Sequence, residues 1–233
     1  MSALLLTIAS GTLYAQKITT ESDYNLRKAY EVIRENNDFE KALELVNLQL
    51  KGTPDNVDAL YLRIRIYQQE GEYGKALADV NHAIRVNKPK KTGMNQSTLY
   101  WWQSYAYAGL EDNAKAAVAA GTAYNLAQKE KSEYYRTIAF DYGRALYNID
   151  DLDGSDAVFR KMLTDDETDA GAMFGLARNM VKREKYDAAE QMLLSAIRVR
   201  ESYPQPYALL VNIYDKKRRV QQGYRRSHRV RGQ

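Results

Sequence analysis

A short motif recurs in this chain at a fixed spacing, and that regularity restricts the possible folds more than any other feature of the sequence. Residues 37–43 read Asn-Asp-Phe-Glu-Lys-Ala-Leu, and residues 71–77, which lie 34 positions further on, read Gly-Glu-Tyr-Gly-Lys-Ala-Leu. The same offset of 34 separates a weaker motif at 150–152 from another at 184–186, and a further version lies at 111–113, 40 positions after the one at 71. Self-similarity at such a period is typical of repeat proteins, in which small units stack on their neighbours.

The spacing of apolar residues within one period indicates a helical hairpin. In the second unit, Leu60 and Tyr67 are bulky residues of the first half, and Tyr73, Ala76 and Val80 follow at helical spacing in the second half. Bulky residues fill the seam between two antiparallel helices, and small residues allow the helices to approach closely. One hairpin cannot bury its apolar face alone, so neighbouring hairpins must stack. A four-helix bundle shares this periodicity, but it does not need a turn that recurs at a fixed offset.

This pattern resembles the tetratricopeptide repeat, a helix–turn–helix unit of about 34 residues. The resemblance covers residues 20 to 217 and implies an all-α fold, a right-handed α-solenoid with five repeats and one unpaired helix. The repeats are expected near residues 23–56, 57–90, 97–130, 136–169 and 170–203, with the partial repeat at 204–217. The chain departs from the family pattern in the long connection at 88–96 and at Ser155, which replaces a small alanine.

Capping residues mark the expected helix starts. Asn56 precedes a helix expected at 57–69, and Asp169 precedes a helix expected at 170–182. Asn and Asp side chains accept hydrogen bonds from the otherwise unpaired N–H groups of a first helical turn. We therefore expect helices to begin directly after these two residues.

The composition excludes several classes of functional site. The chain has no cysteine and two histidines, so disulfides, thiolate zinc sites and cysteine nucleophiles are ruled out and a multi-histidine metal site is not expected. We find no glycine-rich phosphate loop, no nucleophile elbow and no helical histidine pair. The acidic clusters at 150–153 and 165–167 lack the full spacing of a helix–loop–helix calcium site, and we interpret them as turn and cap residues. The sequence therefore predicts no enzyme, no cofactor and no metal.

The resemblance implies a binding face on the first helices, which line the concave side of such a stack. Positions five and nine of a first helix lie on one helical face. In the second to fifth repeats these positions hold Tyr61 and Arg65, Trp101 and Tyr105, Phe140 and Arg144, and Phe174 and Arg178. Aromatic residues and arginine dominate binding hot spots, and arginine pairs with carboxylates. We expect a groove that binds an extended or helical peptide, preferably an acidic one.

Four further residues, Tyr147, Asn148, Asn179 and Lys182, are expected to extend this surface. The alternative is that the aromatic residues pack against the next repeat and that the arginines lie along them as cover, since long cationic side chains often cover apolar surface.

The first sixteen residues resemble a secretory signal peptide. Residues 1–16 form a short apolar run that ends in small residues, and Lys17 follows, so cleavage is expected after Ala15. The alternative is a disordered or buried N-terminal segment. The run is short for a membrane span, so we expect no integral membrane span and a periplasmic or secreted protein.

The end of the sequence breaks the repeat pattern. From Lys216 onward there are eight Lys/Arg and no acid, so the rest of the chain has 26 basic against 30 acidic residues. We expect residues 218–233 to be a basic disordered tail, and a nucleic-acid-binding arm is a possible but less favoured interpretation. The segment from Lys216 can be encoded by a set of codons that, after loss of one nucleotide, is read in another frame. That frame gives Lys-Lys-Gly-Glu-Tyr-Asn-Lys-Ala-Ile, which nearly repeats the motif at 71–77. This indicates the front part of a longer repeat protein, cut by a frameshift or a sequencing error.

Together these features predict a scaffold that binds a protein or peptide partner, with no nucleic-acid partner. The alternative is the recognition module of a longer exported peptidase-type protein. The last intact helix, at 204–217, has no partner helix in this prediction, so Tyr207, Leu210 and Tyr214 are expected to be uncovered on one side.

Overall fold

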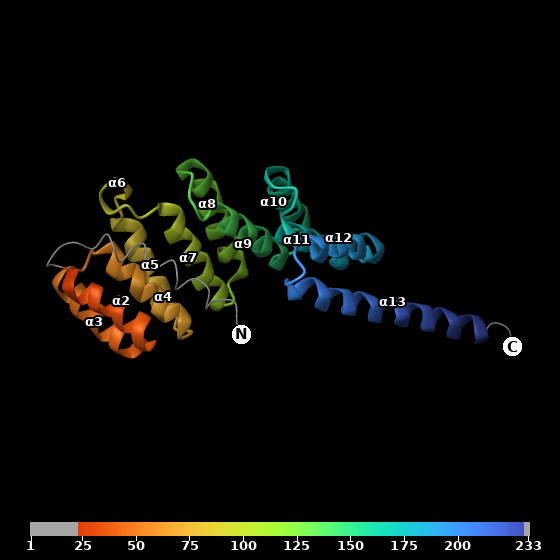
Figure 1. Ribbon diagram of the computed structural model, residues 1–233, viewed down its shortest axis with the longest axis horizontal. Coiled ribbons are helices and arrows are strands. Elements are labelled where there is room, and N and C mark those ends of the chain that lie inside the picture. The colour runs from red at the N-terminus through yellow and green to blue at the C-terminus, as the bar shows by residue number, and fades with distance from the viewer. Residues whose placement is uncertain (1–22, 231–233) are drawn as a thin grey trace. The chain divides into compact units, whose positions relative to one another are not determined.

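The computed structural model describes residues 23–230, with side chains up to Arg218. The expected signal peptide at 1–16 lies outside the described residues. Within them the chain consists of helices, turns and connections without a strand, which confirms the all-helical prediction for this part of the chain (Figure 1). The chain divides into two compact units, Met1–Ser132 and Glu133–Gln233, and each is described by itself.

The first unit contains three helical hairpins and a short additional helix. Its helices are α2 (Tyr24–Asn36), α3 (Phe39–Gly52), α4 (Val57–Gln69), α5 (Tyr73–Val86), α6 (Pro89–Thr92), α7 (Gln96–Gly109) and α8 (Asn113–Glu130). The sequence did not predict α6, which lies in the long connection expected at 88–96. Pro89 occupies its first position, where a missing N–H has no cost, and Gly93 ends it with a left-handed φ of 72°.

The second unit contains two hairpins and a long last helix. Its helices are α9 (Tyr135–Asn148), α10 (Leu152–Asp165), α11 (Ala170–Lys182), α12 (Tyr186–Val199) and α13 (Pro204–Val230). The five hairpins of the two units and the helix that follows agree with the expected arrangement of five repeats and one helix without its hairpin partner.

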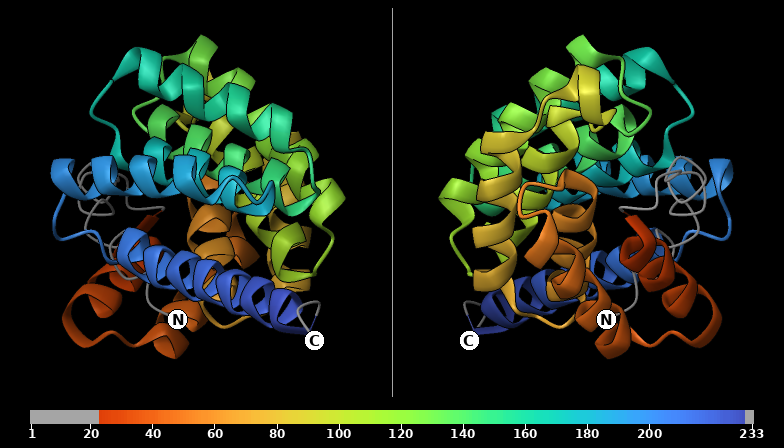
Figure 2. Two further views of the ribbon diagram at one scale, coloured as in Figure 1. Left: turned by 90° about the vertical axis from the view of Figure 1, so that its right-hand side faces the viewer. Right: turned by 90° about the vertical axis from the view of Figure 1, so that its left-hand side faces the viewer.

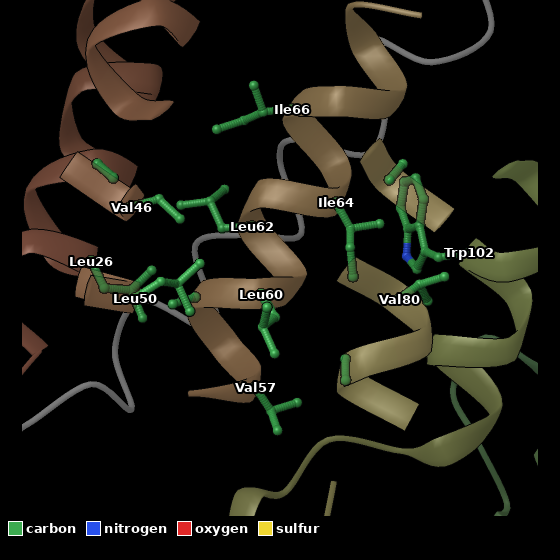
Figure 3. Close-up of a cluster of buried hydrophobic side chains, with 14 of the residues drawn as sticks. Leu26, Val46, Leu50, Val57, Leu60, Leu62, Ile64, Ile66, Val80 and Trp102 are labelled. Atoms are coloured by element: carbon green, nitrogen blue, oxygen red, sulfur yellow. The ribbon is translucent and has the colours of Figure 1, made fainter. Parts of the chain in front are cut away.

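The core of the first unit is a continuous apolar seam, because α4 is apolar on two sides. Figure 3 shows Leu62 among Val46 and Leu50 of the neighbouring α3, and Ile64 on the side of Val80 of α5. All of these side chains are buried. Burying one such side chain stabilises a fold by about 1.5–3 kcal/mol, so each hairpin depends on the next for much of its stability.

Small residues in the second unit allow one aromatic ring to lie between three helices. A Cβ atom added at Gly143 of α9 would be 2.7 Å from the Phe159 ring of α10, and one added at Gly175 of α11 would be 2.4 Å from it. Ser155, the departure from the family pattern, is buried and donates a hydrogen bond from Oγ to the Gly143 carbonyl oxygen at 2.8 Å. The serine therefore serves as a small residue whose hydroxyl group is satisfied.

The expected caps are present at two helix starts. The Asn56 side chain accepts from the backbone N–H of Ala59 at 3.0 Å, and α4 covers the predicted 57–69. Asp169 accepts from the N–H of Ala172 at 2.9 Å, and α11 covers the predicted 170–182. These two predictions are confirmed.

The last helix differs from the expectation of a helix ending at Lys217 and a disordered tail at 218–233. Instead, α13 continues to Val230, and of the expected tail, residues 231–233 lie outside the described residues. Between 218 and 230 the sequence has no proline and one glycine, Gly223, and arginine and glutamine favour helix. Positive charge near a helix C-terminus is also favourable. Among residues 23–230, no helix has the length and apolar character needed to cross a bilayer.

One side of α13 is packed within its unit. Leu210 and Ile213 are buried against α11 and α12 (Figures 1 and 2). Leu210 was expected to be uncovered, and the structure corrects this, whereas Tyr207 and Tyr214 are exposed as expected.

Candidate functional site

The eight predicted site residues divide equally between the two units. Tyr61 and Arg65 on α4 and Trp101 and Tyr105 on α7 lie in the first unit, whereas Phe140 and Arg144 on α9 and Phe174 and Arg178 on α11 lie in the second. All eight are on first helices. Each unit therefore has its own group of four residues.

In the first unit, the aromatic residues form one connected group. The rings of Trp101 and Tyr105 have centroids 5.8 Å apart. Trp102, which the sequence analysis did not select, lies 5.8 Å from Tyr105 and 6.1 Å from Tyr61 in an edge-to-face contact. Trp101 is only 6% exposed, so it packs against the rings of this group and offers little surface to a partner. Tyr61 and Tyr105 are half-buried.

The two arginines of α4 have different environments. Arg63 pairs with Asp79 of α5 through Nε and NH2, both at 2.7 Å, and its NH1 donates to Asn47 of α3, also at 2.7 Å. Arg63 therefore links α4 to α3 and to α5, the second helices on its two sides. The Arg65 guanidinium lies 5.6 Å from the ring centroid of Tyr61, its predicted neighbour on the face.

On α9, the predicted aromatic residue packs within the unit, and the predicted arginine pairs with an acid of the same helix. The Phe140 ring is 5.7 Å from that of Phe159 of α10, and a Cβ atom added at Gly171 of α11 would lie 3.5 Å from Phe140. The Arg144 guanidinium pairs with Asp141, one turn earlier on the same helix, at 2.9 Å. Phe140 and Arg144 are therefore engaged within the unit.

On α11, the predicted pair lies in a cluster of aromatic rings and positive charges. The Arg178 guanidinium carbon is 4.1 Å from the ring centroid of Tyr147 of α9 and 5.9 Å from that of Phe174. The Phe174 ring contacts Tyr203, in the connection to α13, at 5.6 Å. Lys182 lies 4.5 Å from the same Tyr147 ring. We call these five residues the Arg178 cluster.

The charges of this cluster are unevenly paired. Lys182 forms an ion pair with Asp150, whereas no carboxylate of the described residues lies within ion-pairing distance of Arg178. Arg200 lies 5.3 Å from the Tyr203 ring. Burial is the main reason that the pKa of Tyr203 is raised, while the positive charges of Arg200 and Arg178 act in the opposite direction. The cluster is thus a half-buried aromatic surface with an excess of positive charge.

One residue predicted to extend the surface is instead part of the core. Asn179 is completely buried and donates from Nδ2 to Ser155 Oγ at 2.9 Å and to Asp156 at 2.7 Å. Its position one residue after Arg178 turns it by about 100° around α11, toward α10. Asn148 is exposed, and Tyr147 and Lys182 belong to the Arg178 cluster. Tyr203 and Arg200 were missed because they lie outside the first helices on which the pattern was read.

The acidic residues after α9 act within the fold. Asp151 caps α10 by accepting from the N–H of Gly154 at 2.9 Å, and Asp153, in the first turn of α10, forms an ion pair at 2.6 Å with Arg183, the residue that follows α11. The contact of Asp151 agrees with its interpretation as a cap residue, whereas Asp153 lies within the helix. Among the described side chains, those of residues 23–218, there is no group of three or more His, Cys, Asp or Glu arranged to hold a metal ion.

Solved structures similar to this fold are proteins of the kind that the repeat pattern resembles. YrrB, described as a TPR protein with an unusual peptide-binding site, has a TM-score of 0.63 at 19% identity, over 87% of this chain and 97% of YrrB. MamA, from residue 41 to its end, of Desulfovibrio magneticus RS-1 has a TM-score of 0.65 at 11% identity, over 79% of this chain and 98% of that one. TTC0263, a thermophilic TPR protein of Thermus thermophilus, has a TM-score of 0.55 at 17% identity, over 83% of this chain and 98% of that one.

No family model matches the sequence, and no curated protein matches it at a significant level. At identities below 20% the three likenesses establish the fold alone. The described part of the chain has the fold of a tetratricopeptide-repeat protein.

Proposed function

We propose that this chain is a non-enzymatic protein-interaction scaffold whose first-helix faces bind a peptide segment of a partner protein. The observation that carries the proposal is the state of Arg178, whose guanidinium lies on the Tyr147 ring at 4.1 Å without a carboxylate partner among the described residues. The Arg178 cluster is the principal contact in the second unit. In the first unit the proposed contact is formed by Tyr61, Arg65 and Tyr105, and the nearly buried Trp101 packs against Tyr105.

The energies favour an acidic ligand at the Arg178 cluster. A cation–π contact at a partly exposed site stabilises by about 0.5–1 kcal/mol. A hydrogen bond that involves a charged group contributes about 1.5–3 kcal/mol, and arginine can bind a carboxylate through two parallel N–H donors. A hydrogen bond from Arg178 to a peptide carboxylate therefore contributes more binding free energy than the ring contacts alone. The rings can keep their contact with the flat face of the guanidinium.

Aromatic neighbours supply the apolar part of such a site. Phe174, Tyr147 and Tyr203 surround the guanidinium with half-buried rings. Tyrosine and arginine are enriched among the few residues that provide most of the binding energy of an interface. The preferred ligand is thus a segment in which an Asp or Glu stands close to an apolar side chain. YrrB shows that this fold can carry a peptide-binding site, although its low identity does not transfer the site itself.

The test compares peptide selection by the native chain and by two arginine variants. The native chain is used to select from a displayed library of random peptides, and selected peptides are then titrated by fluorescence anisotropy. We expect peptides that combine acidic and apolar residues, with affinity about ten- to a hundredfold weaker for Arg178→Ala, which corresponds to the 1.5–3 kcal/mol of a charged hydrogen bond. The matched control is Arg198→Ala, an exposed arginine of α12 that donates to Ser195.

The control separates a local site from general charge attraction. Equal weakening by Arg198→Ala would mean that net charge alone attracts the peptides. Unchanged affinity of Arg178→Ala, or a library without any selected peptide, would contradict the proposed face.

We also propose that the protein is exported, on the basis of residues 1–16, which lie outside the described residues. Expression in a bacterial host, fractionation and mass spectrometry of the N-terminus test this. A periplasmic product that begins at Gln16 is expected, whereas an uncleaved product in the cytoplasm would contradict export.

A further inference from the structure

The connection between α5 and α7 is the place where the repeat spacing lengthens, and it is rich in lysine. The motif at 111–113 follows the one at 71–77 by 40 residues instead of 34. The added segment forms α6, and the side chains of Lys88, Lys90 and Lys91 are all exposed there. Insertions between repeats lie on the surface and often carry a binding function.

Side-chain hydrogen bonds hold this insertion in one arrangement. Asn87 donates from Nδ2 to the carbonyl oxygen of Met94 at 3.0 Å and to Gln96 at 2.8 Å. Its Oδ1 accepts from the Thr92 hydroxyl at 2.6 Å. Met94 is buried in the core of the first unit. The three lysines are therefore carried by a segment that is fixed to the unit at both of its ends.

The end of α8 adds positive charge at the same end of the first unit. Glu130 accepts from the backbone N–H groups of Gln96 and Ser97 at 3.1 and 3.2 Å, which places the end of α8 beside the start of α7. Figures 1 and 2 show α6 and the end of α8 at the same end of this unit. We give the name basic end to six exposed cations: Arg85, Lys88, Lys90, Lys91, Lys129 and Lys131.

The charges of the basic end are not compensated by described acids. Elsewhere in the unit, four exposed lysines each form an ion pair with an acid three residues away: Lys28, Lys41, Lys75 and Lys115. No cation of the basic end forms an ion pair with a described residue. Two nearby acids are already engaged, because Glu130 binds the start of α7 and Asp55 contacts His82 of α5 at 2.7 Å.

Helix dipoles account for only part of this charge. Arg85 and Lys129 lie in the last turns of α5 and α8, where a positive charge is favourable. Helix α6 has four residues, too few for a substantial dipole, so the lysines of the insertion need another explanation. We propose that the basic end binds the surface of an anionic lipid membrane through the phosphate groups of its lipids.

The residue types favour a lipid surface over a protein or a nucleic acid. Five of the six cations are lysines, and lysine is depleted in protein–protein interfaces. Residues 85–93 and 128–131 contain no aromatic side chain on which the bases of a nucleic acid could stack. Clusters of about four to eight basic residues are typical of proteins that bind anionic lipids. This surface lies outside the first-helix faces of the proposed function and does not depend on them.

The experiment measures how the full chain partitions onto lipid vesicles by co-sedimentation. One set of vesicles contains phosphatidylcholine with about one third phosphatidylglycerol, and the other contains phosphatidylcholine alone. Each lysine close to an anionic bilayer strengthens binding by about fivefold. We therefore expect binding to the anionic vesicles only, about a hundredfold weaker binding when Lys88, Lys90 and Lys91 are all changed to Gln, and about fivefold weaker binding for Lys129→Gln.

The matched control changes Lys28, Lys41 and Lys75 to Gln. These lysines belong to the same unit, and the change in net charge is identical, so their loss should alter vesicle binding by no more than about twofold if the local cluster is what binds. Residues 218–233, which are also basic, are the same in every variant. Thermal unfolding of each variant checks that its fold is intact.

Three results would overturn the proposal. The first is equal binding to neutral and anionic vesicles, or no binding to either. The second is a triple variant of the basic end that binds like the native chain, or a control that loses as much. The third is a duplex oligonucleotide or a polyglutamate that binds the native chain more tightly than the vesicles do and loses this binding in the triple variant, which would assign the basic end to a nucleic acid or an acidic protein. Arg178→Ala should leave vesicle binding unchanged, so the two proposed surfaces succeed or fail separately.

Discussion

The first helices α4 and α13 hold the same place in their repeats but have different surroundings. Ile64 of α4 is completely buried, whereas Val211, at the corresponding position of α13, is 62% exposed. Helix α4 packs against α3 on one side and against α5 and α7 on the other, while α13 packs against α12 and α11. Both helices carry apolar residues on two sides. The neighbours that the fold supplies, and not the helix itself, decide which of these sides is buried.

The largest expected effect of this difference is on core stability. Ile64→Ala should lower the free energy of unfolding by about 2–5 kcal/mol, because it leaves a cavity in a packed seam. Val211→Ala should change it by no more than about 0.5 kcal/mol, as is usual for exposed positions. Thermal or urea unfolding measures both. If both variants lose a similar amount of unfolding free energy, Val211 is covered in solution, and the contrast between α4 and α13 does not hold.

A smaller difference is expected for the ion pairs that hold the two helices. Asp79→Ala removes the main partner of the half-buried Arg63 on α4, and an unsatisfied buried group of this kind costs about 1–3 kcal/mol. Glu190→Ala removes one partner of Lys217 on α13, which keeps Asp187, so its effect on the unfolding midpoint should be clearly smaller. If Glu190→Ala lowers the unfolding midpoint as much as Asp79→Ala does, or more, then ion pairs provide most of the attachment of α13.

The smallest effect is the pH dependence of the attachment of α13. Hydrogen bonds from Lys217, and then from Tyr214, hold the pKa of Glu190 below its ordinary value of 4.5. A carboxylate with a lowered pKa stabilises the folded state above pH 4.5, and this contribution is lost as the pH falls through the folded-state pKa.

Amide hydrogen exchange can detect this loss. After correction for intrinsic rates, the amides of α13 should become less protected in acid, while those of α4 keep their protection. In Glu190→Gln this acid-dependent change should disappear. If the variant shows the same change as the native chain, another carboxylate is responsible.

The sequence predicted the repeated units well because their signals are local. The starts of α4 and α11 follow from Asn56 and Asp169, whose side chains cap the helices that begin one residue later. The length of α13 was wrong, because the loss of the repeat pattern after Lys217 was taken as the loss of helix, although the residues there favour helix. The hypothesis of a changed reading frame stays a prediction, and the nucleotide sequence tests it.

The candidate site was predicted less completely. The pattern identified Phe174 and Arg178 as neighbours on one face, and the structure places them together. It did not show that Arg144 is engaged by Asp141 or that Trp101 is buried. The Arg144–Asp141 pair lies within one helix, at a spacing of three residues that the sequence does show, whereas the burial of Trp101 depends on the side chains of other helices.

The sequence by itself determined that the described part of this protein is helical, where most of its hairpins begin and turn, and which residues form their apolar sides. These properties depend on contacts between residues close in the chain. Tertiary structure decided which arginines pair with acids, that Tyr203 joins the Arg178 cluster, and that one apolar side of α13 stays uncovered. Those outcomes depend on side chains that meet only after separate hairpins have stacked, because burial and pairing of a group are set by everything packed around it.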